Sequence, residues 1–183
     1  VLAGCRAGFV AIDLFTDATL KVQWPDQQCA DVFASAVSAC GKIAAFGRWN
    51  CTVALVTRLD AVLQGRNAVM RTIRCGGWVR SVSIQARRSD IAVGADDDRV
   101  TVHSMPMGGQ KHVAAEKCWR KAVAAYTPDG NMLVHTQRHS TLRWHHIPDT
   151  SNTNMRISLR GLGLCAADVA RAWVCGLSNS EIG

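Results

Sequence analysis

The sequence has few aromatic residues, few prolines and no long apolar run. Only 6% of its 183 residues are Phe, Trp or Tyr. No window approaches the run of about 18 apolar residues that a membrane-spanning helix needs. Apolar residues make up 48% and charged residues 19%, which is too apolar and too lightly charged for a disordered chain. These features argue against a membrane protein, a collagen-like fibre and a disordered tail, and the length favours a single globular domain.

Close cysteine pairs are also absent. The eight cysteines are residues 5, 29, 40, 51, 75, 118, 165 and 175. They form no C-x-x-C motif, so neither a structural zinc site nor the disulfide framework of a small secreted domain is expected. Most of them lie inside apolar runs, where a free cysteine packs as a small hydrophobic residue. This pattern predicts reduced thiols and an intracellular location, cytoplasmic or nuclear.

Motifs for catalysis are missing as well. The sequence has no G-x-S-x-G, no G-x-x-x-x-G-K-[ST] and no H-E-x-x-H. His135, His139, His145 and His146 fall in one expected hairpin. Adjacent residues of a strand point to opposite faces, so His145 and His146 cannot bind one metal ion together. The acidic triplet 96–98 is typical of a tight turn. We therefore expect no enzymatic activity, no metal and no cofactor.

An internal repeat is present, although composition does not reveal it. Five segments share an apolar run that ends on one marked position, usually a small residue, followed in the complete copies by a polar turn and an alternating strand. The marked residues are Gly4, Gly47, Gly94, His135 and Gly176. The intervals between them are similar, and the one from Gly47 to Gly94 is the longest. We attribute that longer interval to a surface loop insertion around Leu59 to Asn67.

The local pattern within each copy predicts strands. Apolar and polar residues alternate in segments such as 9–12 and 141–144, with turn-forming residues at both ends. Further strands are expected between the copies, at 20–24, 69–74, 79–84, 112–115, 122–126 and 154–158. The result is four short strands in each period of about 43 residues, with almost no helix.

This pattern resembles the WD40 repeat, in which about 40–45 residues supply four strands of a β-propeller blade. The most specific match is 125–134, which looks like the second strand, tight turn and third strand of a blade. Its turn, Tyr126-Thr-Pro-Asp-Gly130, has the proline, aspartate and glycine that a tight bend favours. Asp97 falls where the family keeps a hairpin aspartate, and Asn50 and Asn179 take that place in two other copies.

The chain departs from the family at its signature residues. The Trp-Asp pair corresponds here to 12–13, 55–56, 102–103 and 144–145, and no copy has both residues. No Gly-His dipeptide occurs. The hydrogen-bond chain of aspartate, histidine and tryptophan that braces many blades is therefore not expected.

The resemblance implies an all-β, WD40-like β-propeller fragment of about four four-stranded antiparallel blades. We expect one partial propeller domain over 1–183, with repeat units 1–19 (partial blade), 20–62, 68–108, 112–148 and 154–183 (partial blade). The chain opens on Val1 and both ends carry the same strand type, so they do not complement one another. We expect the remaining blades to come from the same protein or from a partner chain.

Superposing the copies places two tryptophans and nearby basic residues together. Counted from the marked residues, Trp78 and Trp119 share one position, each followed two residues later by Arg80 or Lys121. In the family this stretch lies near the rim of a propeller face where partners dock. Trp and Arg are also common at interface hot spots. The candidate partner-binding residues are Trp78, Arg80, Trp119, Arg120, Lys121 and Arg160; the alternative is that the tryptophans pack between blades.

The net charge of +7 favours an acidic partner. We expect a non-catalytic WD40-like scaffold that mediates protein–protein interactions in a multi-subunit complex, docking subunits with acidic segments. The alternative is an RNA-binding β-propeller in a ribonucleoprotein assembly. Because aromatic residues are so scarce, the stacking platform of a single-strand binder would be thin. If the surface is a docking site, the charged tips of Arg80 and Lys121 should be exposed.

Overall fold

Four antiparallel sheets make up the described part of the chain. The computed structural model describes residues 1–12, 14, 16–24, 30–66, 69–86, 90–105, 109–115, 122–127, 129–137, 141–146 and 155–158. The first sheet contains β1 (Leu2–Cys5), β2 (Gly8–Ile12) and β3 (Thr19–Gln23). The second contains β4 (Val32–Val37), β5 (Ile43–Arg48), β6 (Thr52–Thr57) and β7 (Val69–Arg74). The third contains β8 (Val79–Ile84), β9 (Ile91–Ala95), β10 (Val100–His103) and β11 (Gln110–Ala115). The fourth contains β12 (Ala124–Tyr126), β13 (Met132–Gln137), β14 (Thr141–His146) and β15 (Met155–Ser158).

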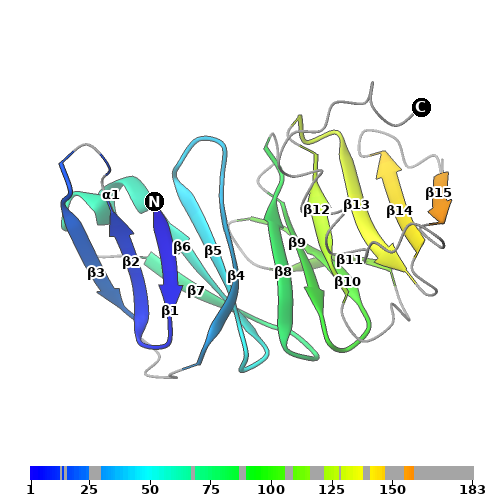
Figure 1. Ribbon diagram of the computed structural model, residues 1–183, viewed down its shortest axis with the longest axis horizontal. Helices are drawn as coiled ribbons and strands as arrows, with labels where there is room; N and C mark the ends of the chain where they lie inside the picture. Colours follow the sequence, from blue (N-terminus) through cyan, green and yellow to red (C-terminus); the bar gives the residue numbers. More distant parts are fainter. Residues whose placement is uncertain are drawn as a thin grey trace.

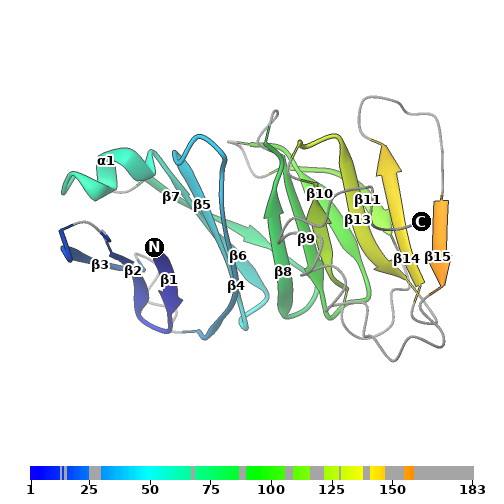
Figure 2. The ribbon, with the colours of Figure 1, turned by 45° about the horizontal axis from the view of Figure 1, so that its top comes forward.

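Within each sheet, every strand pairs with the strands that come directly before and after it in the sequence. The sheets follow one another across the molecule in chain order, from β1–β3 at one side to β12–β15 at the other (Figure 1). The tilted view shows them as successive layers (Figure 2). The described sheets do not close into a ring, so the architecture is a propeller-like row of blades, and the all-β prediction is confirmed at that level.

The sheets are offset by one strand from the expected repeat units. Strands β3, β7 and β11, which open three of those units, are the last strands of the preceding sheets. The segment 125–134 accordingly spans the first and second strands of its sheet rather than the second and third.

The core lies between neighbouring sheets and not within one of them. One buried cluster joins the first two sheets and includes Phe9, Trp24 and Phe46, whose ring centroids lie 5.0–5.7 Å apart. A second cluster joins β5–β7 to β8 and β9, and a third joins β9 and β10 to β12 and β13. Both faces of each internal sheet are therefore buried, which explains why β5, β6 and β9 are apolar almost throughout.

The repeated glycine has a packing role. In the first three sheets the marked glycine faces the start of the next sheet. The contacting pairs are Gly4 with Val32, Gly47 with Val79 and Gly94 with Ala122. A Cβ at any of these glycines would overlap the partner residue. These glycines therefore recur at the spacing of the blades because successive blades approach each other closely at this position.

Side-chain hydroxyls join the third sheet to the fourth. Ser81 Oγ accepts a hydrogen bond from the Ala124 backbone N–H, and Ser83 Oγ accepts one from Tyr126 N–H, both at 2.9 Å. The Gln85 side-chain amide continues the series by donating to the Gly130 carbonyl oxygen at 2.7 Å. Residues 81, 83 and 85 point to the same face of β8 and its extension. This face therefore supplies hydrogen-bond partners to two backbone N–H groups of β12 and to one carbonyl group of the turn that follows it.

We expect Ser81→Ala to destabilise the protein by about 1–3 kcal/mol, because it leaves the buried Ala124 N–H without its acceptor. Ser104→Ala is a matched control, since the Ser104 hydroxyl donates to the Gly109 carbonyl oxygen at an exposed site and its loss should cost under about 0.5 kcal/mol. Urea unfolding followed by circular dichroism measures both. Equal effects of the two substitutions would contradict a stabilising role for the β8–β12 contact.

The prediction of a surface loop around Leu59 to Asn67 is wrong in part. Helix α1 (Leu59–Leu63) occupies its first half, and Leu59 and Val62 pack into the cluster between the first two sheets. These apolar residues cover the end of the core, so the extra length is a small packing element. None of the described helices is long and apolar enough to cross a membrane.

Candidate functional site

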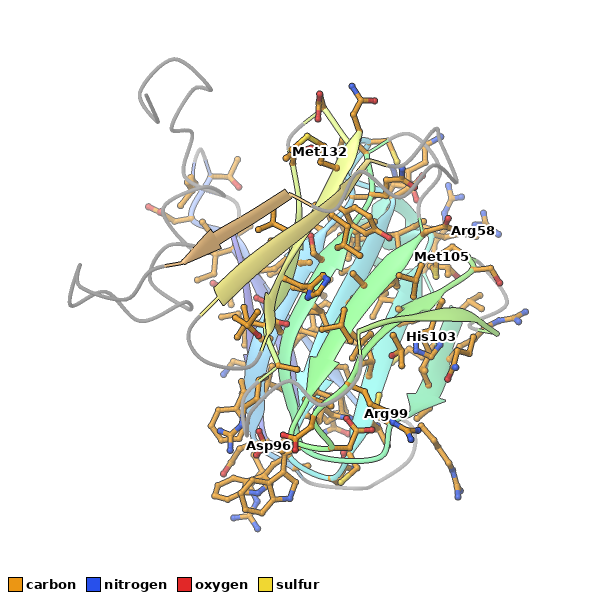
Figure 3. All side chains as sticks on the ribbon, turned by 90° about the vertical axis from the view of Figure 1, so that its right-hand side faces the viewer. Arg58, Asp96, Arg99, His103, Met105 and Met132 are labelled. Atoms are coloured by element: carbon orange, nitrogen blue, oxygen red, sulfur yellow. The ribbon has the colours of Figure 1, made fainter. Side chains whose placement is uncertain are left out.

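The strands of all the sheets run between two ends of the molecule, and one of these ends carries most of the exposed aromatic surface of the described residues. The β1–β2, β5–β6 and β9–β10 turns and the β7–β8 connection all lie at this end. In the side view Asp96 of the β9–β10 turn lies at one end of the molecule, while Arg58, Met105 and Met132 lie at the opposite end (Figure 3). The turns at the Asp96 end come from different sheets, so they place residues distant in sequence on one surface.

Three aromatic side chains meet at this end. Phe33 is 46% exposed, Trp49 is 40% exposed and Trp78 is 41% exposed. Their rings form a chain of contacts, with centroids 5.1 Å apart for Phe33 and Trp49 and 4.7 Å apart for Trp49 and Trp78. Large aromatic side chains left this exposed, and in contact with one another, are typical of an interaction site. We call Phe33, Trp49, Trp78 and the adjacent Arg80 the aromatic patch.

Arg80 is held within the patch by Asp96. Its Nε and Nη2 donate to the two carboxylate oxygens of Asp96 at 2.8 and 2.5 Å. The guanidinium carbon lies 5.3 Å from the ring centroid of Phe33 and 5.5 Å from that of Trp78. The hydrogen bonds to Asp96 raise the pKa of Arg80 above its ordinary value. A bidentate pair beside two rings fixes the orientation of the guanidinium, so Arg80 organises the aromatic side chains around it.

A hollow of about 310 Å³ adjoins the patch and is widely open to solvent. The described residues that line it are Arg6, Ala30, Asp31, Trp49 and Asn50. The Trp49 backbone N–H donates to the Asp31 carbonyl oxygen at 2.9 Å, which fastens the β5–β6 turn to the segment entering β4. Trp49 therefore forms both the wall of the hollow and the centre of the patch. Such a site can accept one side chain of a partner segment.

The structure describes two of the six candidate site residues. Trp78 lies half-exposed in the patch, as a docking role requires. The Arg80 side chain is less exposed than expected: only 24% of it is exposed, and its tip pairs with Asp96. Trp119, Arg120, Lys121 and Arg160 lie outside the described residues, and the grouping of all six stays a prediction.

The alignment of Trp119 with Trp78 does not follow from the register. The marked Gly94 pairs with Ser81 across the β8–β9 hairpin, and the marked His135 pairs with Ala124 across the β12–β13 hairpin. The chain between the paired residues is shorter in the β12–β13 hairpin than in the β8–β9 hairpin. Counting back the same number of residues from the marked residue therefore reaches positions that are not equivalent in the two hairpins.

Sequence reasoning missed three contributors to this site. Phe33 and Trp49 were not among the candidate residues, and Asp96 was assigned to a turn. A usable signal existed, since Trp49 precedes Asn50, the hairpin residue already matched to Asp97. The neighbouring Asp97 does stabilise the β9–β10 turn, because its carboxylate accepts a hydrogen bond from the Arg99 backbone N–H at 3.3 Å.

Metal-binding groups do not accompany the patch. Within the described ranges no three His, Cys, Asp or Glu residues are grouped so that they could hold a metal ion. His135 is buried, and its Nδ1 is hydrogen-bonded to the Thr136 carbonyl oxygen at 2.9 Å. The chemistry that the patch offers is apolar contact and hydrogen bonding.

Comparisons with known proteins show the fold and not the family. The sequence matches no protein-family model and no curated protein. The structure resembles a chain in the crystal structure of the mitotic checkpoint complex, with a TM-score of 0.68, 11% identity and coverage of 87% of this chain and 48% of that chain. The chain thus spans about half the length of that matching chain. Because 927 solved chains match, the fold is common and does not specify a function.

Proposed function

We propose that the chain is part of a WD40-like, non-catalytic scaffold that docks partner proteins through the aromatic patch. The contact chain of Phe33, Trp49 and Trp78 around a fixed Arg80 carries the proposal. Half-exposed tryptophan beside arginine is the composition of an interface hot spot. The structural neighbour belongs to a multi-subunit complex, which supports a role as a complex subunit.

The partner that fits best is a protein segment with an apolar anchor beside a carboxylate. The anchor would cover Trp49 and Trp78, and the carboxylate would approach the exposed Arg6 at the edge of the hollow. The net charge of +7 favours an acidic segment at longer range. Arg80 contributes less charge than expected because Asp96 neutralises it. We propose that apolar burial supplies most of the affinity and that charge sets partner choice.

A ribonucleoprotein role has less support in this geometry. Bases stack on open aromatic faces, whereas Trp49 and Trp78 meet edge to face, at 72°. The Arg80 guanidinium occupies the neighbouring faces of Phe33 and Trp78. RNA binding is therefore the alternative outcome of the test and not a second proposal.

Site-specific photo-crosslinking tests the proposal. A photoreactive phenylalanine analogue in place of Phe33 should crosslink a partner protein in extracts, and the same analogue at Leu63, exposed on α1, should not. The crosslinked segment is then titrated against the purified chain. Trp49→Ala and Trp78→Ala should each weaken binding by about 2 kcal/mol, or about 30-fold in Kd. Leu63→Ala should leave Kd unchanged.

The outcome also separates protein from nucleic acid. A ribonuclease-sensitive crosslink, with affinity that falls steeply as salt rises, would identify RNA as the ligand. Equal crosslinking at positions 33 and 63, or unchanged Kd in both tryptophan variants, would overturn the docking surface. Circular dichroism of each variant confirms that the sheets remain folded.

A further inference from the structure

Two cysteines face one another across the end of the β6–β7 pair, beside the aromatic patch. Thr52 pairs with Arg74, so the next residues outward, Cys51 and Cys75, lie opposite each other. The Cys75 backbone N–H donates to the Cys51 carbonyl oxygen at 2.8 Å, which extends the ladder by one hydrogen bond. Both thiols are free and partly exposed.

Two residues opposite each other in this register are expected to have the spacing that a disulfide needs. Residues directly opposite each other in an antiparallel ladder have Cα atoms about 4.5–5.5 Å apart, and Cys51 joins the ladder from a left-handed backbone conformation with φ 61°. Disulfides span Cα separations of about 4.4–6.8 Å. The two thiols also affect each other electrostatically, since Cys51 contributes to the raised pKa of Cys75. The described thiols Cys5 and Cys40 have no cysteine opposite them in their ladders or turns.

We propose that Cys51 and Cys75 are a redox modification site that forms a cross-strand disulfide by exchange with a low-molecular-weight disulfide such as oxidised glutathione. The Cys51 thiolate attacks one glutathione sulfur, which forms a mixed disulfide and releases one glutathione thiolate. Cys75, as its thiolate, then attacks the Cys51 sulfur and releases the second. The two cysteines lose two electrons and two protons, and oxidised glutathione becomes two reduced glutathione molecules.

The order of attack follows from the surroundings of Cys75. Burial, followed by the nearby charges of Asp97 and Cys51, raises the pKa of Cys75 to about 12. Its thiolate is scarce near neutral pH, so Cys51 attacks first and ring closure by Cys75 is the slow step. The rate of closure should therefore rise about tenfold per pH unit from pH 7 to pH 9.

The site is placed to act on the docking surface. Cys51 follows Trp49 and Asn50 in one turn, and Cys75 precedes Trp78 by two glycines in the next connection. A bond between them would fasten the two segments that carry the tryptophans. The disulfide itself goes beyond the proposed function and does not depend on it.

Peptide mapping tests this site cleanly. Trypsin cleaves after Arg48, Arg58, Arg74 and Arg80, so Cys51 and Cys75 fall in peptides 49–58 and 75–80, which contain no other cysteine. The purified chain is equilibrated with oxidised glutathione, the remaining thiols are alkylated, and the digest is examined by mass spectrometry. We expect a linked pair of these two peptides as the main product, abolished by reduction and absent from Cys51→Ser and Cys75→Ser.

Cys5 reports whether the oxidant has acted. It is exposed and is the only cysteine of peptide 1–6, so it should carry a glutathione adduct. Glutathione on Cys5 while peptides 49–58 and 75–80 remain unlinked would overturn the proposal. Links from Cys51 to other cysteines, in amounts equal to those formed in urea, would overturn it as well. If Trp49→Ala loses docking but peptides 49–58 and 75–80 still become linked, the redox site is supported independently of the proposed function.

Discussion

Gly94→Ala should lower the free energy of unfolding by about 3 kcal/mol, one of the two largest effects expected in this chain. A Cβ at this position would overlap the Ala122 carbonyl oxygen and lie 2.6 Å from Ser81 Oγ. The overlap with backbone cannot be relieved by a change of rotamer, so the third and fourth sheets must separate. The same methyl group would displace the hydroxyl that accepts the Ala124 N–H. Urea unfolding measures the change.

Two further glycines make this test specific. Gly109→Ala is the control, because a Cβ there meets nothing closer than Ser104 Oγ at 3.7 Å, and its effect should stay within about 0.5 kcal/mol. Gly47→Ala meets the Val79 side chain and not the backbone. Its cost should therefore be partly relieved in the double variant with Val79→Ala, with a coupling energy of about 1 kcal/mol. Additive effects at Gly47 and Val79, or equal effects at Gly94 and Gly109, would contradict the account of blade spacing.

The glycine repeat shows how far the sequence can predict this fold. Its period identified the number of strands in each unit, and the expected strands 69–74 and 79–84 coincide with β7 and β8. Both signals are local or periodic, because alternation of apolar residues follows from burial on a sheet and the glycines follow from one repeated contact. The strands assigned to each sheet were offset by one, since the sequence does not show where one sheet ends and the next begins.

The candidate site was less accessible to sequence reasoning. The pairing of Arg80 with Asp96 joins the entry of β8 to the β9–β10 turn, and the contact between Trp49 and Trp78 joins two different sheets. Neither follows from a spacing, because each depends on how turns of separate strands meet at one end. Helix α1 was missed for a related reason. Its buried residues were assigned to a surface loop because an insertion in a repeat lacks the period that identifies the strands.

Arg48 carries the other large effect, because it is a cation in the core beside the docking surface. It is 0% exposed at the end of β5, its Nε donates to Thr52 Oγ1 at 2.8 Å, and its guanidinium carbon lies 5.4 Å from the Trp24 ring centroid. Thr52 Oγ1 in turn donates to Asn50 Oδ1 at 2.6 Å. Arg48→Ala leaves a void and removes the donor to Thr52 Oγ1, so the free energy of unfolding should fall by about 3 kcal/mol.

Arg74 provides the matched control for this prediction. In the register it lies opposite Thr52 on the other side of β6, but its side chain is exposed at the edge of the sheet. Arg74→Ala should change stability by under about 0.5 kcal/mol in the same urea unfolding experiment. Equal effects of the two substitutions would show that Arg48 does not stabilise the β5–β6 hairpin. A loss confined to Arg48→Ala would instead make the buried arginine the support of the turn that presents Trp49.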